Sequence, residues 1–299
     1  MNPAAETPPV TSRKARVAIV PRQQLDFDLD GDIPRFWFGG DAFKTRFFDA
    51  MSTLFPEGER FFIACVRDFR DDIRDPELQQ QVRDFMRQEA QHGKVHSDFN
   101  ARLSRQGVRV DLIEAKSRSM LQWFRRKAPA RLCLAQTAAA EHMTSIMAHG
   151  FFDRPEVFAD ADPRIRAMYV WHGVEEIEHK AVAYDVLKDV ARAGYFTRVF
   201  AMLYVTLLFP MHVFAIMRHM LRIDGFSARQ RLAMWAKGLV WLYGPGGLYV
   251  PMLRDYLAYY RPGFHPWQGG QMRSYARWLE VFDRTGSALA AGNAVHARV

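Results

Sequence analysis

Residues 171–180 read WHGVEEIEHK, in which Glu176 and His179 form a Glu-x-x-His pair flanked by His172 and Glu175. Residues three positions apart in an α-helix lie on the same face, one turn apart. The carboxylate and the imidazole of the pair can therefore bind one metal ion or two adjacent ions. One such pair is a weak indicator on its own, because exposed helices carry this spacing by chance.

A second copy of the pair strengthens the indication. Residues 87–96 read RQEAQHGKVH, in which Glu89 and His92 have the same spacing. Each pair is preceded, thirty to thirty-five residues earlier, by a lone glutamate, Glu59 or Glu141. These positions follow the apolar stripes of the expected helices, so they point inward. Four buried carboxylates without counter-charge would cost several kcal/mol per ion, whereas two divalent ions would compensate them.

Helix start and stop signals divide the first two thirds of the chain into helices. Asp75–Pro76 and Asp162–Pro163 each place an N-capping aspartate before a proline at the first helical position. A shorter helix, about residues 111–126, lies within a long crossover. The main helices are expected over residues 41–73 with an interruption at Pro56, 76–104, 129–150 and 163–194.

The ligand pattern resembles that of the ferritin-like superfamily, whose di-iron and di-manganese bundles take one Glu from each of two helices and Glu-x-x-His from two others. The resemblance implies an all-α, ferritin-like four-helix bundle with a long crossover and additional C-terminal helices. It implies two iron ions, with manganese or a mixed pair as alternatives. The implied metal ligands are Glu59, Glu89, His92, Glu141, Glu176 and His179, with His172 as a further candidate.

The resemblance also implies supporting contacts. In similar bundles the residue before each Glu of the Glu-x-x-His pair reaches the opposite histidine. Gln88 is therefore expected near His179, and Glu175 near His92.

Two further histidines lie one turn from the pairs. His172 precedes Glu176 by four residues, and His96 follows His92 by four. If the two helices are antiparallel, both histidines lie toward the same end of the site. They are candidate catalytic groups; the alternatives are that they bind metal or are buried core residues. The remaining polar residues nearby, His142, Glu178 and Lys180, are expected off the stripe as solvent or packing residues.

More narrowly, WHGVEEIEHK, RQEAQHGKVH and the later GFHPW at residues 263–267 resemble a bacterial family described as predicted metal-dependent hydrolases. This resemblance extends from about residue 20 over nearly the whole chain, and it gives no substrate.

Three functions are compatible with these residues. The first is a di-iron oxygenase or oxidase that uses dioxygen and an electron donor on an organic substrate, which the apolar C-terminal helices suggest is hydrophobic or lipid-like. The second is a hydrolase that uses a metal-activated water. The third is a non-enzymatic iron-binding protein. No Ser-His-Asp triad, P-loop or Gly-rich nucleotide motif is present.

Charge and composition argue against a nucleic-acid-binding protein and against a secreted, disulfide-bonded one. The net charge of +8 comes from scattered arginines without a nucleic-acid-binding module. Two cysteines indicate a reducing compartment, and residues 1–16 lack the apolar stretch of a signal peptide, so a cytoplasmic location is expected.

The expected division of the chain is a flexible tail and irregular arm over 1–40, the metal-binding core over 41–194, and an apolar helical extension over 195–299.

The extension contains an uncharged run of nineteen residues, 199–217, which is long enough to cross a bilayer. Pro210 and His212 argue against spanning, and Gly-Pro-Gly-Gly at 244–247 breaks the next apolar stretch. Packing on the core, or peripheral contact with a membrane through residues 199–253, is the preferred expectation. The sequence does not indicate an oligomeric state.

Overall fold

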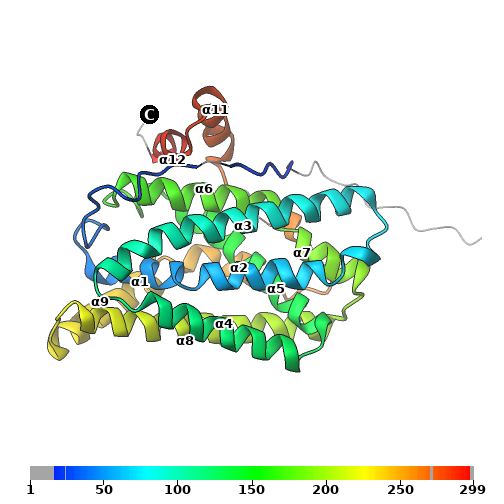
Figure 1. Cartoon of the computed structure of the whole chain (residues 1–299), viewed down its shortest axis with the longest axis horizontal. Helices are drawn as coiled ribbons and strands as arrows, with labels where there is room; N and C mark the ends of the chain where they lie inside the picture. Colours follow the sequence, from blue (N-terminus) through cyan, green and yellow to red (C-terminus); the bar gives the residue numbers. More distant parts are fainter. Residues whose placement is uncertain (1–16, 24, 270–271, 297–299) are drawn as a thin grey trace, which may run out of the picture.

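The computed structural model describes residues 17–23, 25–269 and 272–296, and within them the chain is all-α (Figure 1). An isolated bridge between Phe38 and Ala161 is the one β pairing in these ranges. The predicted all-α helical bundle is confirmed. The tail expected over residues 1–16 lies outside the described residues.

Four helices form the centre of the bundle, and two of them, α3 and α6, begin where the capping signals predicted. Asp75 accepts a hydrogen bond from the Glu77 amide, and Asp162 accepts one from the Arg164 amide, so each aspartate caps the helix that follows it. The central helices are α2 (Phe55–Arg67), α3 (Pro76–Arg105), α5 (Ala130–Met147) and α6 (Pro163–His179).

The helix expected over 163–194 is shorter than predicted. It ends at His179, and the short α7 (Val182–Asp185) and a π-helical turn follow it. The break comes directly after the last residue of the Glu-x-x-His pair. There Lys180 turns its ammonium group over the ring of Trp267, at 4.6 Å from the centroid.

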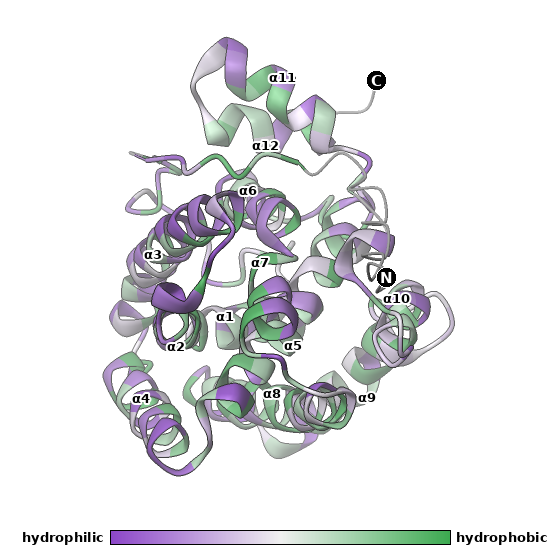
Figure 2. Ribbon diagram, turned by 90° about the vertical axis from the view of Figure 1, so that its right-hand side faces the viewer, coloured by the Kyte–Doolittle hydropathy of each residue, from purple (hydrophilic) through white to green (hydrophobic). Residues whose placement is uncertain are grey.

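The crossover between α3 and α5 is the helix α4 (Val110–Lys127), as predicted. Only Val110 and Ser117 of α4 are buried, and the helix packs on α2 at the margin of the bundle (Figure 2). It is therefore held on the bundle by few buried side chains.

The C-terminal third adds helices on two sides. The 29-residue α8 (Tyr195–Ile223) packs along α5 and α1 (Ala42–Ser52), and α9 (Ala228–Tyr243) folds back beside it. On the opposite side, α11 (Tyr275–Thr285) and α12 (Ala288–His296) cover α6 (Figure 1). The short elements are α10 (Leu253–Ala258), π turns at Ala148–Phe152 and Val186–Val190, and 3-10 turns at Arg70–Asp72, Val250–Met252 and Pro266–Gln268.

The irregular arm before α1 is laid over the bundle, as expected. Phe27, Trp37 and Phe38 of the arm are buried among core aromatics, and Trp37 donates a hydrogen bond to Asp49. Arg22 is buried as well, and its contacts lie directly behind the residues of the expected metal site.

Candidate metal centre

All six predicted ligands are buried and point into the space between the four central helices. Each residue is at most 4% exposed. They come from α2 (Glu59), α3 (Glu89, His92), α5 (Glu141) and α6 (Glu176, His179).

One end of the cluster is organised around His179. Its Nε2 lies 3.1 Å from Oε1 of Glu89 and 3.2 Å from Oε2 of Glu141. Oε2 of Glu176 is 3.6 Å from the same nitrogen. Glu89, Glu141 and His179 bring their ligand atoms within 4.8 Å of one another, which is close enough to share a metal ion.

The other end is organised around His92. Its Nδ1 lies 3.5 Å from Oε1 of Glu89 and 3.8 Å from Oε1 of Glu176. Glu59, His92 and His172 form a further group whose ligand atoms lie within 4.8 Å. Because Glu89 and Glu176 approach both histidines, they lie between the two ends and can bridge two ions.

The hydrogen bonding of these residues fits bound cations. Among the described residues, both carboxylate oxygens of Glu59, Glu89 and Glu141 lack a hydrogen-bond partner, although all are buried. Nδ1 of His92 and Nε2 of His179 lack one too. Buried polar atoms without a partner are costly and rare, and the eight atoms named here belong to residues that meet in one cluster. Carboxylate and imidazole donors in this number suit two divalent ions.

The electrostatics lead to the same conclusion. Burial, followed by the neighbouring carboxylates, holds the pKa of Glu59 well above its usual value. Burial also raises the pKa of Glu89 and of Glu141 to about 8. Burial opposes the ionisation of Glu176, but the hydrogen bond with His172 and the nearby imidazole of His179 outweigh it and hold the pKa of Glu176 well below its usual value. Without cations, the cluster retains protons on most of its carboxyl groups.

Both supporting contacts expected from the sequence are present. Oε1 of Gln88 lies 2.8 Å from Nδ1 of His179, and Oε2 of Glu175 lies 3.1 Å from Nε2 of His92. Residue numbers rise along α3 as they fall along α6 in these pairs, so the two helices are antiparallel. Each contact occupies the outer ring nitrogen and leaves the inner one facing the site.

The two flanking histidines occupy different positions. His172 Nε2 lies 2.9 Å from Oε1 of Glu176, so His172 belongs to the site. His96 is one step further out, with Nε2 2.7 Å from Nδ1 of His172 and Nδ1 2.8 Å from Oγ of Ser52. Both nitrogens of His96 are therefore engaged, one by His172 and one by Ser52, and His96 is placed to orient His172.

A charged layer behind the site was not predicted. Arg22 Nη1 lies 3.0 Å from Oε1 of Glu175, and its Nη2 lies 2.7 Å from Oε1 of Glu178. Glu178 also accepts hydrogen bonds from Gln88 Nε2 at 2.7 Å and from the Tyr275 hydroxyl at 2.8 Å. The arm and α11 thus join the residues that hold the two imidazoles.

Of the two alternatives expected for the off-stripe residues, solvent or packing, the structure shows buried packing positions. Glu178, His142 and Lys180 are all at most 3% exposed, so none is a solvent residue. Glu178 is also one of the groups that tie the arm to α6. The sequence contained one indication of this layer, because two further acids, Glu175 and Glu178, lie close to the expected ligand Glu176. Nothing in the sequence indicates that they pair with Arg22.

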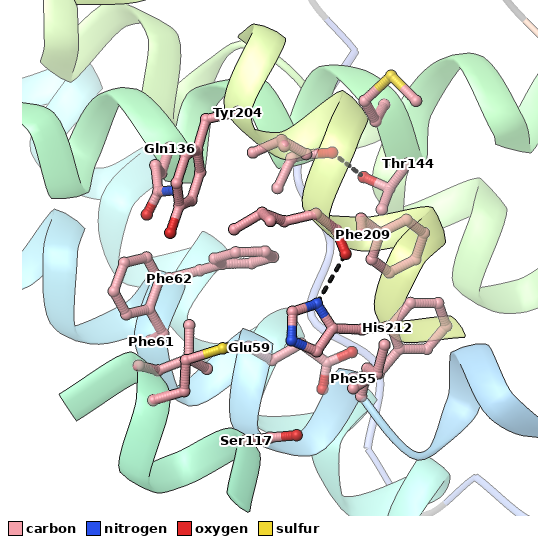
Figure 3. Close-up of a pocket in the computed structure, with 18 of the residues that line it drawn as sticks. Phe55, Glu59, Phe61, Phe62, Ser117, Gln136, Thr144, Tyr204, Phe209 and His212 are labelled. Carbon is pink, nitrogen blue, oxygen red and sulfur yellow. Dashed lines mark hydrogen bonds between the residues drawn. The ribbon is translucent and has the colours of Figure 1, made fainter. Parts of the chain in front are cut away.

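An apolar cavity of about 170 Å³ ends at the cluster (Figure 3). Glu59, His172 and Glu176 lie among its lining residues, and the hydroxyl of Thr144 donates a hydrogen bond to Glu176. The other walls come from α2, α4, α5 and α8, and they include Phe55, Phe61, Phe62, Met143, Tyr204 and Phe209.

His212 of α8 also lines this cavity (Figure 3). Its Nδ1 lies 2.7 Å from the carbonyl oxygen of Leu208, so Nδ1 carries the proton of the neutral ring and Nε2 keeps a lone pair. The sequence suggested His212 only as an obstacle to membrane spanning. The structure places it in the cavity that contains Glu59.

The model of a family described as predicted metal-dependent hydrolase matches residues 21–270. The chain belongs to this family. No curated protein and no solved structure matches it. The family description agrees with the narrower resemblance and with the second of the three functions, hydrolysis, and it does not support the oxygenase interpretation. Within this family, the buried His and Glu groups of the chain are suited to hold metal ions.

Proposed function

We propose that this protein is a hydrolase that uses two divalent metal ions to act on a largely apolar organic substrate. The main support for this proposal is the set of buried carboxylate oxygens and imidazole nitrogens that have no hydrogen-bond partner and lie at the inner end of an apolar cavity. The family description supports the choice of hydrolysis among the reactions that such a site performs.

The proposed ligands divide into two sets. Glu59 and His92 would hold one ion, Glu141 and His179 would hold the other, and Glu89 and Glu176 would be shared by both; His172 would be a further ligand of the first ion. When bound, such a pair of ions activates water and polarises the bond that is cleaved.

The surrounding residues have three tasks. Gln88 and Glu175 orient the two imidazoles through their outer nitrogens. The phenylalanines of the cavity wall bind apolar parts of the substrate and exclude bulk water. His212 Nε2 is available within the cavity to accept a proton from water or to return one to a leaving group.

Oxidation by dioxygen is the second candidate. Its support is the composition of the donor set, in which four carboxylates and two imidazoles on four helices match the pattern of ferritin-like di-iron bundles. This function would require iron or manganese and an external electron donor. A non-enzymatic iron-binding role has less support, because it does not account for the apolar cavity that reaches the cluster.

Reconstitution with defined metals distinguishes these functions. The metal-free protein is loaded anaerobically with Zn²⁺, Mn²⁺ or Fe²⁺ and assayed with esters of increasing acyl chain length. Turnover of long-chain esters under argon, including by the redox-inactive Zn²⁺ form, is the expected result. Activity confined to the iron form, with one dioxygen consumed per product, would replace hydrolysis by the second candidate.

A further inference from the structure

An exposed apolar stripe runs along the outer side of α8. Phe196, Phe200, Leu203, Leu207 and Met211 recur at intervals of three and four residues, and Phe196 and Leu207 are 83% and 69% exposed. The opposite side of the helix is buried through residues such as Ala201, Met202, Val213 and Met217. The stripe therefore faces away from the bundle.

The stripe continues onto neighbouring elements. α9 lies beside α8, where Phe214 and Trp235 are in edge-to-face contact with ring centroids 5.3 Å apart. On α9, Leu232 is 72% and Val240 is 65% exposed. Figures 1 and 2 both place α4, α8 and α9 on one side of the molecule. We call the exposed apolar side chains of these three helices the apolar face; they are Leu112, Trp123, Phe196, Phe200, Leu203, Leu207, Met211, Leu232, Leu239, Val240 and Tyr243.

Basic residues accompany this face. Residues 195–262 contain eight arginines and lysines and two aspartates, Asp224 and Asp255. Asp224 is engaged by the buried Arg46, and Asp255 by His149. The charge of this segment is therefore strongly positive; on α8 and α9 the exposed basic residues are Arg218, Arg222, Arg229 and Lys237, and Arg254 and Arg261 follow in and after α10.

We propose that the apolar face docks on the surface of an anionic lipid bilayer. Large exposed apolar patches mark interaction surfaces. The combination of aromatic and aliphatic side chains with arginine and lysine matches a bilayer interface, where acyl chains meet anionic headgroups. A second copy of the chain fits less well, because two faces of the same positive charge would repel each other.

The packing of α8 favours docking over spanning. α8 is the one described helix that is long and apolar enough to cross a membrane. Its buried Arg198 donates hydrogen bonds to the carbonyl oxygens of Tyr259 and Arg261, and its inner side packs on α5 and α1. Crossing a bilayer would break these contacts, whereas lying on its surface leaves them in place.

The cavity lies behind this face. α4 and α8 form its outer wall, with the rings of Phe124 and Tyr204 stacked at 5.7 Å between centroids. α4 is held by few buried side chains, and together with α8 it separates the cavity from the outer side of the molecule. On this basis, and resting on the proposed function, the substrate enters from the bilayer as a lipid or another amphiphile with an apolar chain.

Vesicle binding tests the docking directly. The metal-loaded full chain is sedimented with vesicles of phosphatidylcholine alone or with 30% phosphatidylglycerol. Binding at least tenfold tighter to the anionic vesicles is expected, with a partial loss in high salt. Leu203→Glu/Leu207→Glu should weaken binding at least tenfold. A control with the same charge change, Ala101→Glu/Ala276→Glu on exposed positions of α3 and α11, should bind as the unmodified protein does.

Several outcomes would overturn the inference. These are no binding to anionic vesicles, equal binding by both double variants, resistance to extraction at alkaline pH, or a dimer that Leu203→Glu/Leu207→Glu dissociates. Lipids brominated in the acyl chain should also quench the fluorescence of the exposed Trp123. The part of the quenching that is absent in Trp123→Phe is then due to Trp123. Vesicle binding is measured independently of turnover. A protein that binds two metal ions but does not bind vesicles would therefore contradict membrane docking and leave the proposed hydrolase function untouched.

Discussion

His172 and His96 are in hydrogen-bond contact across the antiparallel pair α6 and α3, with Nδ1 of His172 2.7 Å from Nε2 of His96. This contact occupies the outer nitrogen of His172 and leaves its Nε2 toward Glu176 and the space shared with Glu59 and His92. The two ends of the site are therefore unequal, because the His179 end has no corresponding extra histidine among its close groups in the described chain.

Replacing His172 should weaken one metal site selectively. His172→Ala is expected to lower the affinity for one of two ions by roughly 10- to 100-fold, the range typical of lost metal-site interactions. Calorimetric titration of the metal-free protein with Mn²⁺ measures this. His149→Asn, which alters a histidine outside the cluster, should leave both affinities unchanged. Equal weakening of both ions by His172→Ala would contradict the asymmetry.

Gly93 should be required beside Glu59. A Cβ at position 93 would lie 3.0 Å from Oε2 of Glu59, so Gly93→Ala must displace this carboxylate by a few tenths of an ångström. We expect weaker metal binding at the His92 end. Gly58→Ala is the matched control, because a Cβ there meets nothing within 4 Å; it should add about 0.5–1 kcal/mol of stability. Unchanged metal binding in Gly93→Ala would place Glu59 outside the ligand set.

Arg22 should contribute strongly to stability. Its side chain is 3% exposed and pairs with Glu175 and Glu178, whose side chains are fully buried. Arg22→Met removes the cation that pairs with both carboxylates, and breaking a buried pair in this way costs about 3–5 kcal/mol. Urea unfolding of the metal-loaded protein measures the loss. The double variant Arg22→Met/Glu178→Gln, which removes one of the two buried negative charges as well, should recover part of the lost stability. A loss below about 1 kcal/mol in Arg22→Met would contradict the stabilising role of Arg22.

The metal-free protein should lose stability as pH rises. The folded-state pKa of Glu89 and of Glu141 is about 8, above the unfolded value of about 4.3. Between these values the folded state binds more protons than the unfolded state, so the free energy of unfolding falls with pH and levels off above about 8. Melting temperatures measured in chelator at pH 5.5 and pH 8 check this. Divalent metal should reverse the trend, since deprotonated carboxylates bind it more tightly.

His212 should affect turnover without affecting metal content. It lines the cavity but is not part of any close metal-binding group in the described residues. His212→Leu is expected to retain two ions and to lower kcat at least tenfold, because the variant has no nitrogen that can accept or return a proton in the cavity. A kcat that is unchanged while KM rises would indicate that His212 binds substrate only.

The ligand cluster was predictable because its determinants are local. Glu-x-x-His spacing and capping aspartates are set within one helix, and the structure brings all six predicted residues together. The Gln88 and Glu175 contacts follow from the antiparallel register of two such helices. The ferritin-like assignment and the identity of the metals remain predictions.

The layer behind the site could not be predicted for the opposite reason. Arg22 meets Glu175 and Glu178 across more than 150 residues of sequence, and such a pairing depends on how the arm crosses the finished bundle. The same holds for His212, whose position in the cavity depends on how α8 packs on α5. The end of α6 at His179 also departs from the prediction, since the apolar period continues past it.

The metal content of the purified protein tests the central claim most directly. After reconstitution under argon and removal of free ions, elemental analysis should find two divalent ions per chain. In Glu141→Ala this value should fall toward one, because Glu141 is proposed to hold only the ion at the His179 end. At most a trace of metal in the unmodified protein, with Mn²⁺, Zn²⁺ and Fe²⁺ all offered, would contradict the account.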